Sequence, residues 1–360
     1  MPDHASTPAP AAYTAGLVNA ADGVPVATYT WLPDGGRPRA FVQIAHGAGE
    51  HALRYDRFAR HLMEHGYGVI ASDHRGHGAT AQATGGYGVT GSSSDALSGA
   101  GSEAPSDAAA DALSGAGSGA ASDAPSGASG VSASFDSWRA IVDDLKAIGD
   151  QVRTLHPGTP LFLLGHSMGS HLARDYAQEY PDGLAGVILS GTFRSLPGVG
   201  IDESIARLER EIAEGGREAL SSYLPELFAA FNDAYPHRTG FEWLSRDESE
   251  VDAYVADERC GFPFSAGLCL DWVRAVRKMN DPRNLARVPA DLPVHIAVGT
   301  EDPCNQGMTL VHELVEDYRY VGLDDLTWRG YEGARHEILN ETNRDEVQED
   351  LLTWMDKRVL

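Results

Sequence analysis

The sequence predicts an α/β fold in which a mostly parallel, eight-stranded sheet is flanked by helices. Two observations lead to this prediction. Short apolar segments alternate with amphipathic helical patterns along most of the chain, which is typical of a parallel sheet covered by helices. Hydrophobic residues make up 42% of the 360 residues, which is enough to build a substantial buried core.

The strands are predicted from short apolar runs bounded by turn residues. The first two runs flank Asp22-Gly23, so we expect them to form an opening hairpin. The predicted strands lie at residues 17–18, 24–31, 40–45, 68–72, 161–165, 186–190, 294–299 and 326–331. The clearest helical patterns lie between them, at residues 55–65, 135–155, 168–180 and 309–318, with a final helix from about residue 344 onward.

Residues 193–281 interrupt this alternation, because four helical patterns follow one another there without a convincing strand. We expect this segment to form a helical cap inserted into an α/β core of residues 1–192 and 282–360. The first cap helix should end at Gly215-Gly216. The apolar faces expected for the first two helices consist of Ile205, Leu208 and Ile212, and of Leu220, Leu224, Leu227, Phe228 and Phe231.

A second unusual segment covers residues 91–134, which contain no aromatic residue, no Lys and no Arg. The segment consists almost entirely of Ser, Ala, Gly, Asp and Pro, a composition that cannot bury a core. We therefore expect a disordered insert within the core. Lengthening an exposed loop costs only about 0.6 kcal/mol per doubling, so such an insert is tolerated by the fold.

Charge and composition exclude several classes of function. The chain has 28 Lys and Arg against 52 Asp and Glu, and its formal charge of −24 repels phosphate backbones, so we expect no nucleic acid partner. We expect no stable membrane insertion, because no apolar run approaches the roughly 18 residues of a spanning helix. Residues 1–20 lack a secretory signal pattern, and the three cysteines lack metal-ligand spacing. These features predict a cytoplasmic protein without a bound metal.

The first candidate for chemistry is the pentapeptide at residues 165–169, GHSMG, which fits the G-x-S-x-G pattern. Its context makes it informative, because it follows an apolar strand and opens a helix. That strand-turn-helix arrangement exposes a serine oxygen on a sharp turn. We therefore predict Ser167 as a nucleophile.

A serine hydroxyl needs a base, and the base needs a group that orients it. Asp302 lies just after the strand predicted at residues 294–299, and His336 lies just after the last strand, before the closing helix. The order Ser, Asp, His is the one expected for a serine hydrolase built on this type of sheet. Glu301 is the alternative acid, but the shorter Asp302 followed by Pro303 suits a fixed turn better.

Backbone amides are the expected donors to the oxyanion. Met168 follows the nucleophile at a helix N-terminus, and Ala48 lies in the loop after the strand predicted at residues 40–45. We expect both amides to serve. His46 and Glu50 are expected to brace the loop, and residues 73–78 to act as scaffolding.

Five motifs together resemble the monoacylglycerol lipase and lysophospholipase group of the α/β-hydrolase superfamily, also described as serine aminopeptidase S33-like. They are HGAGEH at 46–51, SDHRGHG at 72–78, GHSMG at 165–169, GTED at 299–302 and ARHE at 334–337. The resemblance covers nearly the whole chain. It implies an α/β-hydrolase fold, a triad of Ser167, Asp302 and His336, an oxyanion hole from Ala48 and Met168, a helical cap and no cofactor.

The expected activity is the hydrolysis of small carboxylic esters such as monoacylglycerols, lysophospholipids or other acyl and aryl esters. Two alternatives use the same triad, namely an aminopeptidase and an acyltransferase. A third alternative is a catalytically silent scaffold that binds a ligand through the cap, because a fold alone does not fix a function.

Overall fold

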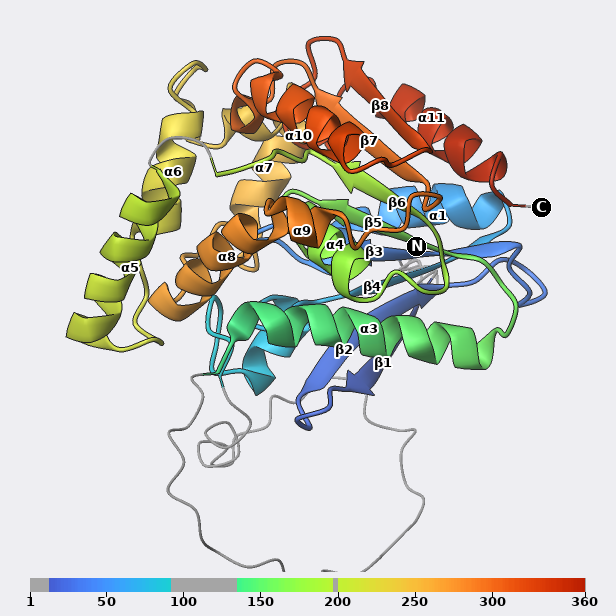
Figure 1. Ribbon diagram of the computed structural model, residues 1–360, viewed down its shortest axis with the longest axis horizontal. Coiled ribbons are helices and arrows are strands. Elements are labelled where there is room, and N and C mark those ends of the chain that lie inside the picture. The colour runs from blue at the N-terminus through green and yellow to red at the C-terminus, as the bar shows by residue number, and fades with distance from the viewer. Residues whose placement is uncertain (1–12, 92–134, 197–199, 360) are drawn as a thin grey trace, which may run out of the picture.

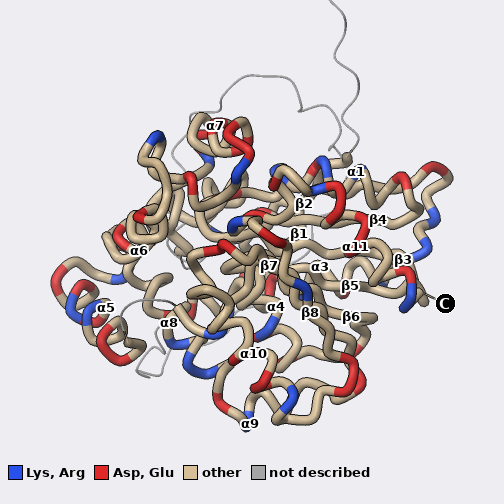
Figure 2. Tube along the Cα trace, turned by 90° about the horizontal axis from the view of Figure 1, so that it is seen from above, with Lys and Arg blue, Asp and Glu red and all other residues tan. Residues whose placement is uncertain are grey.

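The computed structural model of the chain describes residues 13–91, 135–196 and 200–359. Nearly all of the predicted disordered insert, residues 92–134, lies outside the described residues. Within the described ranges, no helix combines the length and the apolar character needed to cross a membrane. Lys and Arg are interspersed with Asp and Glu along helices such as α5 (Ile201–Gly215) (Figure 2).

Eight strands of the described chain form one sheet in the order β1-β2-β4-β3-β5-β6-β7-β8. β1 pairs antiparallel with β2 and β2 antiparallel with β4, and every other pair is parallel. The prediction of a mostly parallel, eight-stranded sheet is confirmed. The strands are β1 (Thr14–Asn19), β2 (Pro25–Trp31), β3 (Ala40–Ala45), β4 (Tyr67–Ser72), β5 (Leu161–His166), β6 (Leu184–Ser190), β7 (Val294–Gly299) and β8 (Leu326–Tyr331).

The largest departure from the predicted strands is β1, which begins at Thr14 where only residues 17–18 were expected. β1 is an edge strand, and five of its six side chains are exposed. An exposed edge has no buried face and therefore leaves no apolar alternation in the sequence. The inner strands β3, β4, β5 and β7 are buried along their whole length, which is why their apolar runs predicted them closely.

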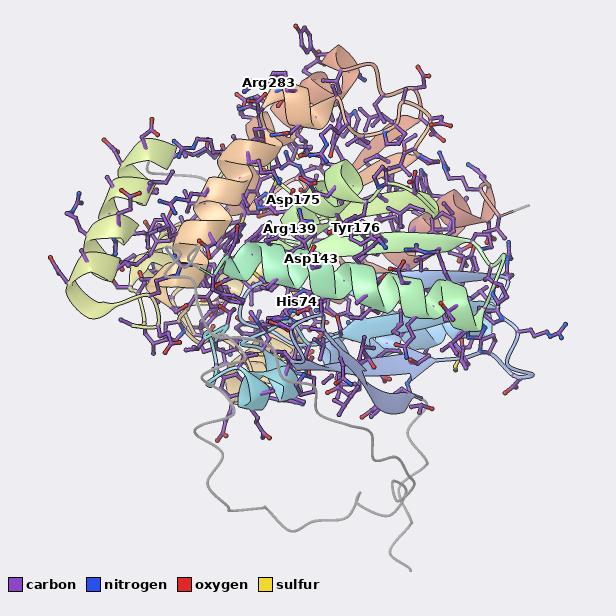
Figure 3. The ribbon with its side chains drawn as sticks, turned by 60° about the horizontal axis from the view of Figure 1, so that its bottom comes forward. His74, Arg139, Asp143, Asp175, Tyr176 and Arg283 are labelled. Atoms are coloured by element: carbon purple, nitrogen blue, oxygen red, sulfur yellow. The ribbon has the colours of Figure 1, made fainter. Side chains whose placement is uncertain are left out.

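Helices cover both faces of the sheet (Figure 1). α3 (Ser137–Leu155), α4 (Met168–Glu179) and α10 (Thr309–Tyr320) share a core with one face, while α1 (Asp56–Glu64) and α11 (Arg344–Asp356) share a core with the other. α3 and α4 lie side by side, with Asp143 on α3 and Asp175 on α4 labelled in Figure 3. The indole of Trp138 on α3 donates a hydrogen bond to Asp175 at 2.9 Å.

The described part of residues 193–281 consists mainly of helices and the turns between them. It contains α5, α6 (Tyr223–Phe231), α7 (Glu248–Ala256) and α8 (Ala266–Met279), and is followed by the short α9 (Pro282–Leu285). α8 packs against α3, α4 and α5, so it joins the segment to the sheet layers. One side-chain prediction is wrong: Leu220 lies before α6 and is 58% exposed, because the chain pairs there with Ser265 in a short bridge.

The parallel strands end at one edge of the sheet, and this places distant loops together. Residues 46–50 follow β3, Ser167 follows β5, Asp302 follows β7, and His336 follows β8. Because these four strands are neighbours or near neighbours in the strand order, the loops after them converge. This edge is where the candidate site lies.

Candidate active site

Ser167 lies in the sharp turn between β5 and α4. Its backbone has φ 53° and ψ −118°, a strained conformation that non-glycine residues rarely adopt. The turn requires glycine on both sides. A Cβ on Gly165 would lie 2.1 Å from the Gly169 carbonyl oxygen, and a Cβ on Gly169 would lie 2.0 Å from the Ala45 carbonyl oxygen. The geometry predicted from the pentapeptide is therefore present, and it leaves Ser167 partly exposed.

Asp302 and His336 form a buried hydrogen-bonded pair. His336 Nδ1 lies 2.8 Å from Asp302 Oδ2, and the two residues are 2% and 1% exposed. The other carboxylate oxygen of Asp302 accepts the amide of Cys304 at 2.8 Å, which fixes the carboxylate plane. Burial is the largest influence and opposes a charged His336, but the attraction and hydrogen bond of Asp302, together with the charges of Glu337 and Glu50, outweigh it and raise the imidazole pKa above its usual value.

The elbow carrying Ser167 packs next to His336. The neighbouring His166 ring lies 4.9 Å from the His336 ring, and a Cβ on Gly47 would lie 3.3 Å from the Ser167 Cβ. Neither the Ser167 hydroxyl nor His336 Nε2 has a hydrogen-bond partner in the described part of the chain. Such bonds commonly tighten only when substrate binds, so a free hydroxyl and a free Nε2 are consistent with a resting site.

Among the three consecutive residues 47–49 of the loop after β3, one amide lacks a partner in the described chain. The Gly47 amide donates to Glu50 Oε1 at 2.5 Å, and the Gly49 amide donates to His77 Nε2 at 3.3 Å. Between them, the Ala48 amide has no partner among the described residues. The Met168 amide is likewise unpartnered there, because Met168 is the first residue of α4. Both amides predicted to bind an oxyanion are therefore available.

Histidines brace this loop as neutral side chains. The His74 amide donates to His46 Nε2 at 3.0 Å, so the proton of the neutral His46 ring sits on Nδ1 and is donated to the Gly47 carbonyl at 2.8 Å. Burial, together with the nearby His77, lowers the pKa of His74 to about 3 (Figure 3). The bracing and scaffolding contacts expected for residues 46–50 and 73–78 are present.

Several residues near the site gave no clear signal in the sequence. The Trp243 ring lies 5.0 Å from the His336 ring, and its carbonyl accepts the His336 amide at 3.4 Å. Arg54 pairs with Glu337, the residue directly after His336. The position of Glu337 directly after His336 indicated that it lies near the site. No sequence pattern indicated that Arg54, 283 residues away, is its partner.

Two clusters in the described chain bring together side chains of metal-ligand type: His51, Asp257 and Cys260, and Asp302, Cys304 and His336. In each cluster a histidine nitrogen and an aspartate oxygen already bond one another, at 3.0 Å and 2.8 Å. These internal bonds engage the histidine and the aspartate of each cluster.

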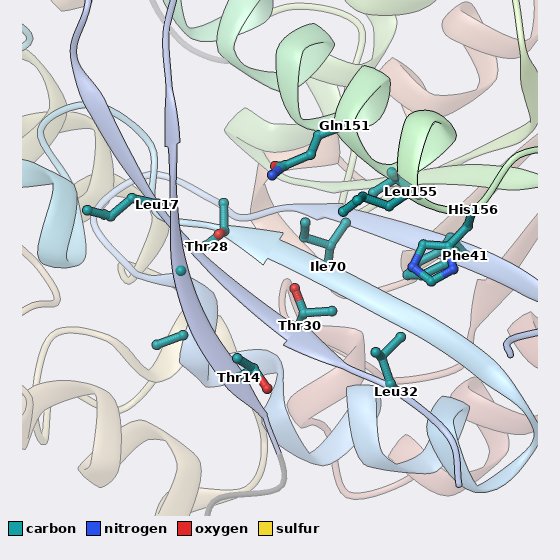
Figure 4. Close-up of a pocket in the computed structure, with 13 residues that line it drawn as sticks. Thr14, Leu17, Thr28, Thr30, Leu32, Phe41, Ile70, Gln151, Leu155 and His156 are labelled. Atoms are coloured by element: carbon teal, nitrogen blue, oxygen red, sulfur yellow. The ribbon is translucent and has the colours of Figure 1, made fainter. Parts of the chain in front are cut away.

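Two cavities differ in their relation to the site. One of about 290 Å³ lies between β1, β2 and the end of α3, and none of the candidate residues line it (Figure 4). The other, of about 380 Å³, lies beside α6 and is lined by Phe228, Phe241 and Phe262. Gly261, which also lines the second cavity, donates its amide to the Gly49 carbonyl at 2.8 Å, so this cavity adjoins the candidate oxyanion loop.

Comparison with known protein families shows which family this chain belongs to. The family model described as Hydrolase_4 (serine aminopeptidase, S33) matches residues 36–97 and 112–343. The chain belongs to the Hydrolase_4 family. The interval that the Hydrolase_4 model skips falls inside the Ser- and Ala-rich segment, while all five motifs lie within the matched ranges.

Relatives of this Hydrolase_4 chain include monoglyceride lipase from Homo sapiens, with 28% identity over 95% of this chain and 90% of the relative. Monoacylglycerol lipase from Mycolicibacterium smegmatis is 24% identical over 92% and 93% of the two chains. Among solved structures, a thermostable carboxyl esterase from Bacillus coagulans, in complex with glycerol, superposes with a TM-score of 0.78. It has 26% identity and covers 97% of this chain and 99% of its own. The α/β-hydrolase fold is confirmed.

Proposed function

We propose that this chain is a carboxylic ester hydrolase that works through an acyl-enzyme on Ser167. The observation that carries the proposal is the buried Asp302–His336 pair beside the strained Ser167 turn. Family membership and relatives named as monoglyceride lipases support ester hydrolysis as the reaction class.

In the proposed mechanism, Ser167 attacks the ester carbonyl while His336 Nε2 takes its proton. Asp302 accepts a hydrogen bond from the Nδ1–H of His336, which keeps Nε2 free to act as a base and stabilises the imidazolium that forms. His336 then returns the proton to the leaving alcohol. Water activated by the same imidazole cleaves the acyl-enzyme and regenerates Ser167.

The free Ala48 and Met168 amides would stabilise the oxyanion of each tetrahedral intermediate. One such donor is typically worth about 10²–10³-fold in kcat, because it is fixed before charge develops. The neighbouring Gly47 and Gly49 amides hold the loop in place rather than contact substrate. Of the three consecutive amides at residues 47–49, only that of Ala48 lacks a partner in the described chain and is left to bind an oxyanion, which supports Ala48 as the donor from this loop.

We further propose residues 193–281 as a cap over the acyl or aryl part of a small ester. The 380 Å³ cavity beside α6 supports this role, because its aromatic walls suit an apolar group and it adjoins the Gly49 carbonyl. The core would then comprise residues 1–192 and 282–360. No cofactor is needed for this chemistry.

The aminopeptidase alternative requires acids in the cap that are free to bind a substrate amine. Glu226 lies 2.7 Å from Arg207, and Asp247 lies 2.7 Å from Arg344, so both of these acids are already paired. Their pairing removes Glu226 and Asp247 as amine-binding groups. Asp233 lines the cavity beside α6 without an ion pair among the described residues, so a substrate assay must separate ester hydrolysis from aminopeptidase activity.

A side-by-side assay tests the proposed reaction. The purified protein should hydrolyse p-nitrophenyl esters and a monoacylglycerol, and should leave aminoacyl anilides intact. Cleavage of the anilides alone would instead support the peptidase. Transfer of the acyl group to an added alcohol without net hydrolysis would support the acyltransferase. Inactivity on all substrates would support the silent scaffold.

The pH dependence provides a separate prediction. Asp302 raises the pKa of His336 above its usual value of about 6.5, so the imidazole becomes protonated, and useless as a base, at a correspondingly higher pH. We expect kcat/KM to be constant at alkaline pH and to fall as the pH drops through a midpoint above 6.5. A rate that stays constant from pH 8 to pH 4 would contradict His336 as the base.

A further inference from the structure

The guanidinium of Arg54 lies between two loops of the proposed site. Arg54 follows β3 in the first 3-10 turn, η1 (Ala52–Tyr55). Its Nη1 donates to Glu50 at 2.7 Å and to Glu337 at 2.5 Å, and its Nη2 donates to the second oxygen of Glu337 at 2.7 Å. A planar fork of this kind fixes both the distance and the orientation of its carboxylate partners.

Each of these two carboxylates is connected to a group used in the proposed mechanism, one through a hydrogen bond and the other through the chain. Glu50 receives the Gly47 amide on its other oxygen at 2.5 Å and so holds the loop that presents the Ala48 amide. Glu337 directly follows His336 in the chain. A single side chain therefore connects the oxyanion loop after β3 with the histidine loop after β8.

A third contact ties Arg54 to the segment proposed as the cap. Its guanidinium lies 4.9 Å from the centre of the Tyr254 ring on α7, and the Tyr254 hydroxyl donates to the Gly49 carbonyl at 2.9 Å. The side chains of Arg54, Glu50 and Glu337 are only 11%, 4% and 6% exposed. Ion pairs sequestered from water in this way are screened little by salt.

We propose that Arg54 is a positioning residue that sets the oxyanion donor at Ala48 and the base at His336 in one geometry. The inference rests on the proposed function. It extends that function by naming a residue that touches no reacting atom yet controls two groups that do.

The expected kinetic signature is a loss of kcat without a loss of binding. Misplacement of a catalytic group by about 1 Å can cost about 100-fold in rate. Arg54→Met should lower kcat by about that factor and leave KM nearly unchanged, because Arg54 does not line the cavity beside α6. Arg54→Lys keeps the charge but lacks the fork, so it should recover part of the rate.

Replacing Glu337 should shift the pH dependence of kcat/KM, which a purely structural role of Glu337 would leave unchanged. The charged groups that act on His336 are Asp302, Glu337 and Glu50, which raise its pKa, and the neighbouring His166, whose positive form would lower it. Glu337→Gln removes one of the raising charges while Arg54 still compensates Glu50. The acid limb of kcat/KM should therefore move to lower pH.

The experiment compares ester hydrolysis against pH for the wild type, Arg54→Met, Arg54→Lys, Glu337→Gln and the control Arg60→Met, with the melting temperature of each. Arg60 forms a local pair with Asp56 on α1 at 2.6 Å and is the matched arginine. Its variant should keep wild-type kcat.

If Arg54→Met does not fold, Arg54→Lys tests the role of Arg54 by itself. Folded Arg54→Met or Arg54→Lys with wild-type kcat would overturn that role, and Glu337→Gln with an unmoved acid limb would overturn the contribution of Glu337 to the base at His336. An inactive wild type would instead refute the proposed function itself, so the two failures are distinguishable.

Discussion

Replacing Ser167 with alanine is expected to lower kcat/KM for ester hydrolysis by on the order of 10⁴-fold or more. The hydroxyl is the proposed nucleophile, and losing a nucleophile that acts together with a base typically costs several powers of ten. Folding should be unaffected, because the hydroxyl has no hydrogen-bond partner among the described residues. Steady-state rates on a p-nitrophenyl ester, with melting curves of both proteins, provide the measurement.

Ser137→Ala is the control for a serine hydroxyl lost elsewhere. Ser137 is buried at the start of α3 and accepts a hydrogen bond from Thr90 at 2.6 Å, on a different part of the molecule. Its variant should retain wild-type rates. A folded Ser167→Ala variant with undiminished activity would exclude Ser167 as the nucleophile.

Asp302→Asn is expected to lower kcat by about 10⁴-fold, the loss seen when the acid of another serine hydrolase triad is replaced in this way. The new amide can donate to Nδ1, which favours the tautomer with its proton on Nε2. In that tautomer His336 cannot accept the Ser167 proton. KM should change much less than kcat, because Asp302 is 1% exposed and lies behind His336.

Glu301→Gln tests the alternative acid directly. Glu301 is exposed, and its hydrogen bonds in the described chain are made by its backbone. The carbonyl accepts from the Tyr235 hydroxyl, and the amide donates to the Ala334 carbonyl at 3.0 Å. We expect this variant to retain wild-type kcat. Loss of activity in Glu301→Gln together with normal activity in Asp302→Asn would reverse the assignment.

Much of the fold was predictable because burial leaves a pattern in the sequence. β3 and β7, which are buried along their whole length, begin and end where predicted. β8 does as well, although it is a mostly exposed edge strand, so burial does not account for that match. The exposed edge strand β1 was underestimated because it has no buried face. Leu220 was assigned to a helix on spacing alone, whereas a bridge to Ser265 holds it outside α6.

The convergence of the candidate residues was predictable, because it depends on their positions after particular strands. Ser167, Asp302 and His336 each follow a strand that the sequence indicated, and parallel pairing brings those strand ends together. The contacts of Arg54 were not predictable, because ion pairs across 283 residues depend on side-chain packing rather than spacing.

The free Ala48 amide was selected from the loop motif alone. The reason it is free became visible only when Glu50 and His77 were seen to occupy the amides on either side. Sequence spacing can place a loop at a site, but it does not show which of three consecutive donors remains unpaired.

The most direct test of the central claim is to treat the folded protein with a fluorophosphonate probe and locate the adduct by peptide mass spectrometry. We expect one adduct, on Ser167, formed more slowly in Asp302→Asn because the base is impaired. An unlabelled active protein, or an adduct on another serine with Ser167 unmodified, would contradict the claim that Ser167 and the Asp302–His336 pair act as one catalytic unit.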